Sequence, residues 1–119
     1  MVLPPPLPPW RPQEEIDTGV RMISPRLVEN AEQVAAFLTL LGNSKRLAIM
    51  SHLLEGEMTV GSIAERVSLS QSALSQHLAK LRSMDLVSTR RDRQMIYYSC
   101  RSEPVRRLLG TLDGIFGEA

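Results

Sequence analysis

Short neutral polar side chains gather along one segment, residues 69–82, whose apolar residues recur at helical spacing. They are Gln71, Ser72, Ser75 and Gln76, and an α-helix would place them on one side, opposite its leucines. Amides and hydroxyls can both donate and accept hydrogen bonds without carrying a charge. A helix that enters a DNA major groove, about 12 Å wide, needs such groups in mid-face, because they reach base edges without bulk. The segment therefore favours base reading, against the alternative of a polar solvent face in a generic helical bundle.

Positive charge surrounds this segment. Residues 70–107 contain eight Lys and Arg against three Asp and Glu, a net charge of +5, whereas the whole chain carries only +1. Arg82 ends the segment, and Arg90, Arg91 and Arg93 follow close behind it. Arginine binds phosphate oxygens and inserts into narrow minor grooves, so we expect these four side chains to contact the DNA backbone or the minor groove. An unevenly charged solvent surface is the alternative.

Hydrophobic periodicity predicts the elements that position these residues. Apolar spacing and capping residues predict helices over residues 24–41, 44–55, 59–67, 70–82 and from 104 onward. Between the last two, "LVSTR" and "QMIYYS" alternate like strands around a polar "RDR" turn. The predicted fold class is mainly α with a small β-hairpin wing (α+β), in the order helix, helix, helix, helix, hairpin, helix. The third and fourth helices form a helix-turn-helix, and the hairpin is its wing.

The chain is predicted to be one domain preceded by a tail. Six of its eight prolines lie in the first twelve residues, which favours a disordered leader over residues 1–23 and a folded domain over 24–119. No apolar run approaches the roughly 20 residues that span a bilayer, and the proline-rich start is unlike a secretory signal. With a single cysteine, Cys100, the composition fits a cytoplasmic protein without a membrane partner.

Cys100 and His77 offer little chemistry by themselves. The cysteine follows the second predicted strand and is interpreted as a small apolar residue, with a redox-responsive role as the alternative. His77 falls at the edge of the apolar side of its helix and is interpreted as a hydrogen-bonded structural residue. The sequence has no Gly-rich phosphate loop and no convincing carboxylate pair, so we predict that it is not an enzyme. A protein-interaction adaptor that uses the winged-helix fold and the proline-rich tail stays open as an alternative function.

The string "LSQSALSQHLAKLRSMDLVSTRRDRQMIYY", with the order of elements, resembles the ArsR/SmtB family of bacterial winged-helix repressors over residues 27–117. Within the family the resemblance is strongest to the branch of nodulation regulators and persulfide sensors. It implies a homodimer that binds an inverted repeat in promoter DNA, with two recognition helices in successive major grooves about 34 Å apart. The first and last helices would form the dimer, through Val34, Leu38, Leu108, Leu112, Ile115 and Phe116.

The usual sensing sites of that family are missing from this sequence. Where other members carry a metal-binding cysteine box, it has Thr59 and Gly61, and its last helix has no histidine. Two histidines and one cysteine cannot assemble the usual tetrahedral zinc site, so no metal and no cofactor are expected. The persulfide branch uses two cysteines, at places held here by Ser51 and Gly117. One cysteine cannot form an intrachain bond, so a dithiol switch of that type is excluded.

Overall fold

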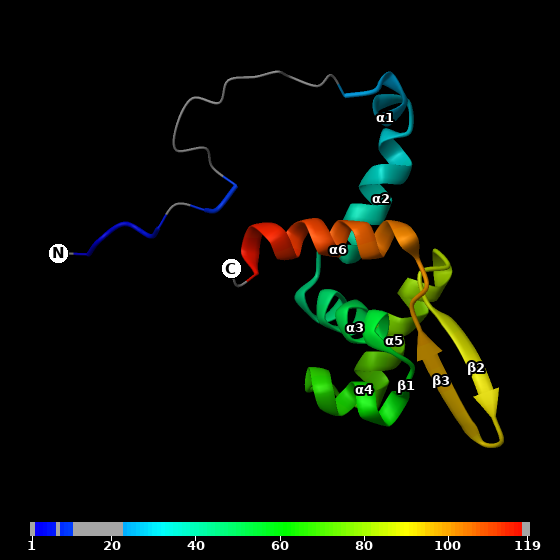
Figure 1. Ribbon diagram of the computed structural model, residues 1–119. Coiled ribbons are helices and arrows are strands. Elements are labelled where there is room, and N and C mark those ends of the chain that lie inside the picture. Colours follow the sequence, from blue (N-terminus) through cyan, green and yellow to red (C-terminus); the bar gives the residue numbers. More distant parts are fainter. Residues whose placement is uncertain (1, 7, 11–22, 118–119) are drawn as a thin grey trace.

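Six helices and a small antiparallel sheet make up a computed structural model that describes residues 2–6, 8–10 and 23–117 (Figure 1). In chain order the elements are α1 (Pro25–Glu29), α2 (Ala31–Leu41), α3 (Ser44–Glu55), β1 (Met58–Thr59), α4 (Val60–Val67), α5 (Gln71–Ser83), β2 (Ser88–Asp92), β3 (Met95–Ser99) and α6 (Glu103–Phe116). The predicted class, mainly α with a β-hairpin wing, is confirmed. In the predicted leader, residues 2–6, 8–10 and 23 form no helix or strand. The rest of the leader lies outside the described residues, so its disorder stays a prediction.

The core lies where α3, α4 and α5 meet beneath the start of α6, and Figure 1 shows α3 between α6 and α4. Each fully buried aliphatic side chain contributes about 2 kcal/mol to folding by leaving water. The largest fully buried side chains are Ile49, Met50, Leu53, Ile63, Leu74, Leu78, Leu81 and Val105. Three come from α3 and three from α5, so these two helices anchor the domain.

The prediction of one helix over residues 24–41 is wrong in one respect. The segment forms two helices, α1 and α2, which are separated at Asn30. Ser24 caps α1, with its Oγ accepting from the Arg26 N–H at 3.1 Å. At Asn30 the backbone leaves the helical region (φ −104°, ψ 23°), and the side-chain amide donates to the Arg26 carbonyl at 2.9 Å. A short polar side chain that bonds to nearby backbone competes with helix continuation, which explains the break.

The wing is a three-stranded antiparallel sheet in the order β1-β3-β2. The predicted turn over residues 91–93 is wrong, because β2 and β3 continue until Asp92 pairs with Met95. The turn is Arg93 and Gln94, and Arg93 adopts the left-handed region at φ 60°. The strand β1 was not predicted from the sequence, because two residues are too few to show an alternating pattern. It pairs with β3 and ties the hairpin to the start of α4.

Candidate nucleic-acid interface

The turn of the helix-turn-helix, residues 68–70, is held by backbone and side-chain hydrogen bonds. Ser68 ends α4 in the left-handed conformation (φ 57°, ψ 53°), where glycine is the usual residue. The Leu69 N–H donates to the Ala64 carbonyl at 3.0 Å. Ser70 then caps α5, with its Oγ accepting from the Ala73 N–H at 3.2 Å. These bonds fix the direction in which α5 leaves α4.

Helix α5 divides into a buried side and an exposed side, as predicted. Leu74, Leu78 and Leu81 are at most 2% exposed and close the core shared with α4. The opposite side exposes every predicted DNA-contacting residue of this helix, namely Gln71, Ser72, Ser75, Gln76 and Arg82. The structure therefore brings the predicted base-reading residues onto one solvent face, and their contact with bases stays a prediction.

The three wing arginines do not share one environment. Arg91 and Arg93 are exposed, and neither forms an ion pair with any residue that the structure describes. Arg90 instead forms a bidentate pair with Glu57, with Nε to Oε2 at 2.9 Å and Nη2 to Oε1 at 2.8 Å. Its guanidinium also lies 4.6 Å from the ring centre of Tyr97. Arg91 and Arg93 are thus the wing side chains most available to phosphates, whereas Arg90 holds the hairpin to the segment before β1.

Glu57 is the residue of this region that sequence reasoning missed. It lies 33 residues from Arg90 in the sequence, and only the pairing of β1 with β3 brings the two together. Hydrogen bonds from Arg90 lower the pKa of Glu57, so its carboxylate is ionised at neutral pH. An exposed pair of this kind adds little stability, but its bidentate geometry fixes the direction of the arginine.

Cys100 and His77 are both engaged inside the domain. Cys100 is 4% exposed, and burial raises the pKa of its thiol, which disfavours the reactive thiolate. This supports its interpretation as a small apolar core residue over a redox role. His77 is half-buried, and its Nδ1 lies 3.2 Å from Nη1 of Arg46. The hydrogen bond expected of this histidine is present.

Within the described part of the chain, helices α2 and α6 leave apolar side chains exposed. Exposed fractions reach 50% for Leu38, 43% for Ile115 and 56% for Phe116. The other predicted dimer residues are half-buried, namely Val34, Leu108 and Leu112. Uncovered apolar side chains on neighbouring helices are typical of a surface that another protein covers.

A contact from the N-terminal segment touches this surface. The ring of Trp10 lies against that of Phe116, with centroids 5.7 Å apart and planes inclined by 56°. Figure 1 shows the blue segment that carries Trp10 beside the red end of α6. Both rings remain more than half exposed, at 67% and 56%, so this contact covers only the margin of the apolar surface.

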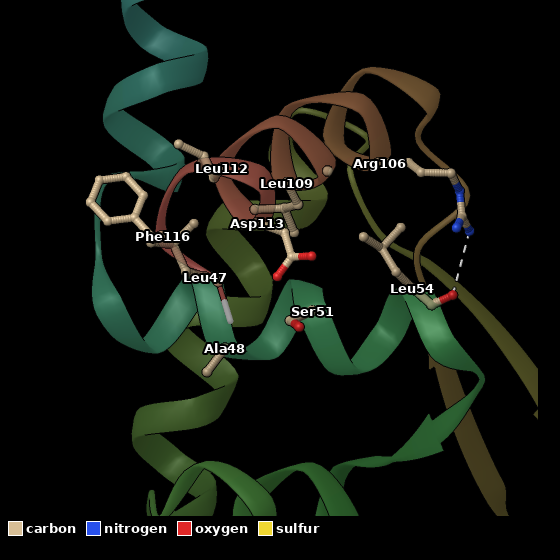
Figure 2. A pocket seen from close by; sticks show the side chains of 11 residues that line it. Leu47, Ala48, Ser51, Leu54, Arg106, Leu109, Leu112, Asp113 and Phe116 are labelled. Carbon is tan, nitrogen blue, oxygen red and sulfur yellow. Dashed lines mark hydrogen bonds between the residues drawn. The ribbon is translucent and has the colours of Figure 1, made fainter. Parts of the chain in front are cut away.

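A groove of about 860 Å³ runs between α3 and α6 (Figure 2). Its walls are mostly apolar, and Ser51 and Asp113 face one another across it. At one end, Arg106 donates to the Leu54 carbonyl at 3.4 Å. Ser51 and Gly117, which the resemblance places where persulfide sensors have cysteines, both line the groove. Without thiols on its walls, the groove can offer apolar contact and hydrogen bonds, but no disulfide chemistry.

The described residues contain neither a cluster of metal ligands nor a membrane-spanning helix. No three His, Cys, Asp or Glu side chains lie there in an arrangement that could hold a metal ion. None of the helices described is both long enough and apolar enough to cross a bilayer. The expected lack of a metal, a cofactor and a membrane partner remains a prediction for the whole chain.

A helix-turn-helix with a neutral polar face, followed by an arginine-bearing β-hairpin, defines a winged helix-turn-helix DNA-binding protein. Residues 43–89 match the family model described as bacterial regulatory protein, arsR family. The chain is also 53% identical over 96 residues to the nodulation protein NolR of Rhizobium meliloti, across 81% of this chain and 79% of that protein. The chain belongs to the ArsR family, as the sequence predicted, and is a transcriptional regulator and not an enzyme.

Solved structures agree with this assignment. NolR from Sinorhizobium fredii superposes with a TM-score of 0.74 at 53% identity, over 84% of this chain and 100% of that one. A homodimeric winged helix-turn-helix DNA-binding domain from Mycobacterium bovis, a possible ArsR-family transcriptional regulator, superposes with a TM-score of 0.66. That domain is 32% identical, over 78% of this chain and 86% of its own. The winged fold is therefore shared by relatives of quite different sequence.

Proposed function

We propose that this regulator is a homodimeric repressor that acts in the cytoplasm by binding an inverted repeat in promoter DNA. The observation that carries the proposal is the exposed face of α5, neutral and rich in hydrogen-bonding groups, beside the arginines of the hairpin. Neutral amides and hydroxyls suit base edges, and arginines suit phosphates. Repression would follow from occupancy, because a dimer lying on a promoter denies the same DNA to the polymerase.

Two sets of side chains divide the work in this proposal. Base contacts are assigned to the α5 face, which carries Gln71, Ser72, Ser75 and Gln76. Contacts to the backbone or minor groove are assigned to Arg82, Arg90, Arg91 and Arg93. Arg90 must share its guanidinium with Glu57, so we assign it a smaller part than Arg91 and Arg93.

Dimerisation is assigned to the apolar surface of α2 and α6, which in a monomer would face water. A two-fold pair of α5 helices then meets successive major grooves, about 34 Å apart, and so selects an inverted repeat. Covering Leu38, Ile115 and Phe116 gives the dimer its apolar driving force.

The division of labour can be tested with two substitutions of opposite expected character. Duplexes would first be selected from a random pool by the wild-type protein, and affinities measured on the selected duplex and a scrambled one. Gln71→Ala should weaken binding to the selected duplex by about 1–3 kcal/mol, by removing contacts to particular bases. It should not change binding to the scrambled duplex. Arg91→Ala should weaken binding to both alike and lower the slope of affinity against salt by about one.

Identical behaviour of the two variants on both duplexes would contradict the assigned roles. Failure of the wild type to enrich any sequence above competitor DNA would instead contradict the proposed function and favour the adaptor.

A further inference from the structure

Arg46 is a buried cation without a buried anion. It is 8% exposed and is the one charged side chain classed as buried in the described part of the chain. Neither ion pair found among the described residues includes it. Removing a guanidinium from water is unfavourable unless its N–H groups find acceptors, so its hydrogen-bond partners should show why it is buried.

Those partners come from two other helices. The Arg46 Nε donates to the carbonyl of Leu40, in the last turn of α2. Its Nη1 lies 3.2 Å from Nδ1 of His77, in the middle of α5. The guanidinium thus joins α3, which carries it, to α2 on one side and to the proposed recognition helix on the other.

Lys45 makes a parallel connection from the neighbouring position. Its Nζ donates to the carbonyl of Val67, the last residue of α4, at 2.6 Å. Both cations therefore lie at the C-terminal ends of other helices, where unpaired carbonyls favour positive charge.

The position of these two cations on their own helix is electrostatically unfavourable. Lys45 and Arg46 stand in the first turn of α3, which has no acidic residue and whose N-terminal end disfavours positive charge. Asn43 partly compensates by accepting from both of their backbone N–H groups, at 3.0 and 3.1 Å. Residues that oppose such local preferences are often found at functional sites, so we infer that Arg46 has a role beyond stabilising its own helix.

We propose that Arg46 is a positioning residue that sets the angle of the recognition helix α5 relative to α2 through its contact with His77. This inference rests on the proposed function, because α5 reads bases and α2 belongs to the dimer surface in that proposal. A small rotation of α5 about its axis would carry its polar face away from base edges while leaving the wing arginines on the phosphates. Loss of the contact should therefore reduce sequence preference more than total DNA affinity.

The contact has a proton dependence that a packing role would lack. Arg46 has only N–H donors, so His77 must offer a bare Nδ1, which requires the neutral ring. The charged groups that act on this ring are all cations, namely Arg46, Lys80 and Lys45, and none is a carboxylate. Burial, followed by these three cations, lowers the pKa of His77 below its ordinary value near 6.5. The contact is thus complete above about pH 6.5 and is lost as the pH falls through the lower value of the folded protein.

The test measures the ratio of affinities for the selected and scrambled duplexes between pH 5.5 and 7.5. The wild-type ratio should stay constant above about pH 6.5 and fall, about tenfold in all, as the pH drops through the lowered pKa of His77. His77→Asn places a neutral oxygen near the position of Nδ1, so its ratio should stay high across the range. His77→Leu removes the acceptor, and its ratio should be low at every pH, while its affinity for the scrambled duplex matches the wild type. The chain has one other histidine, so His52→Asn is the matched control and should keep the wild-type profile.

Amide hydrogen exchange without DNA gives a second measurement. His77→Leu should speed exchange in α5 and in the last turn of α2, and His77→Asn should not. A wild-type ratio in His77→Leu, or a wild-type pH profile in His77→Asn, would overturn the inference. If the wild type prefers no duplex, the proposed function fails, and the exchange experiment alone still decides whether Arg46 and His77 couple α2 to α5.

Discussion

The α4–α5 pair and the surface of α2 and α6 differ in how completely the chain buries their apolar side chains. In the α4–α5 pair, apolar side chains such as Ile63, Leu74 and Leu81 are fully buried within the chain. On α2 and α6, by contrast, Leu38 and Phe116 remain about half exposed. The first region buries its apolar side chains within one chain, whereas the second exposes apolar surface among the described residues, which we propose a second copy covers.

This difference predicts how damage to each region should behave. A substitution inside the α4–α5 pair should lower the stability of the single chain. A substitution on the α2–α6 surface should leave the chain folded and weaken its association. Substitutions in the two regions should therefore separate unfolding from dissociation.

The largest effect is expected from the core of the recognition helix. Leu78→Ala removes a side chain that is 2% exposed and leaves a cavity, so the free energy of unfolding should fall by about 3 kcal/mol. Urea unfolding at one fixed protein concentration measures it. Gln76→Ala, on the exposed face of the same helix, is the matched control and should change it by less than about 0.5 kcal/mol. Equal losses for both variants would show that α5 is not anchored as described.

A smaller effect, of another kind, is expected on α6. Phe116→Asp places a charge on the proposed dimer surface and should weaken association by about 2 kcal/mol, roughly 30-fold, with helical content unchanged. Sedimentation equilibrium over a range of protein concentrations measures the dissociation constant. Met95→Asp, at a residue 48% exposed on the wing, adds the same charge elsewhere and should leave the constant unchanged. An unaltered dimer in the Phe116 variant would remove α6 from the interface.

The smallest effect is expected at the turn between α4 and α5, and it is stabilising. Ser68 holds a left-handed backbone that costs a residue with a Cβ about 1 kcal/mol and costs glycine almost nothing. Ser68→Gly should raise the free energy of unfolding by about 0.5 kcal/mol, because the greater freedom of the unfolded glycine offsets part of the gain. Thermal melting measures it, with Ser68→Ala as the control that keeps the strain. Destabilisation by glycine would mean that the serine hydroxyl has a role of its own.

Local pattern in the sequence was sufficient for much of this architecture. Apolar spacing and capping residues predicted α3 with the bounds found, and the polar face of α5 was predicted residue by residue. Such features depend on neighbours within one or two turns, which the sequence lists directly.

What the sequence could not supply are contacts between distant segments. The pair of Arg90 with Glu57 spans 33 residues, and the contact of Arg46 with His77 spans 31. Each depends on a register or a helix crossing that periodicity does not encode. The break at Asn30 was missed for a different reason, because a single asparagine can either continue a helix or interrupt it through its own side chain.

The contact between Trp10 and Phe116 has an optical consequence. Trp10 is the sole tryptophan of the chain, so all of the tryptophan fluorescence comes from a ring beside the end of α6. If a second protomer displaces the indole from Phe116, the emission should move slightly to longer wavelength, because a ring that is already 67% exposed becomes fully hydrated. If the protomer covers both rings, the emission should move to shorter wavelength. The intrinsic fluorescence of Trp10 therefore reports, without an added label, whether a second protomer binds the α6 surface and whether it displaces or covers the indole.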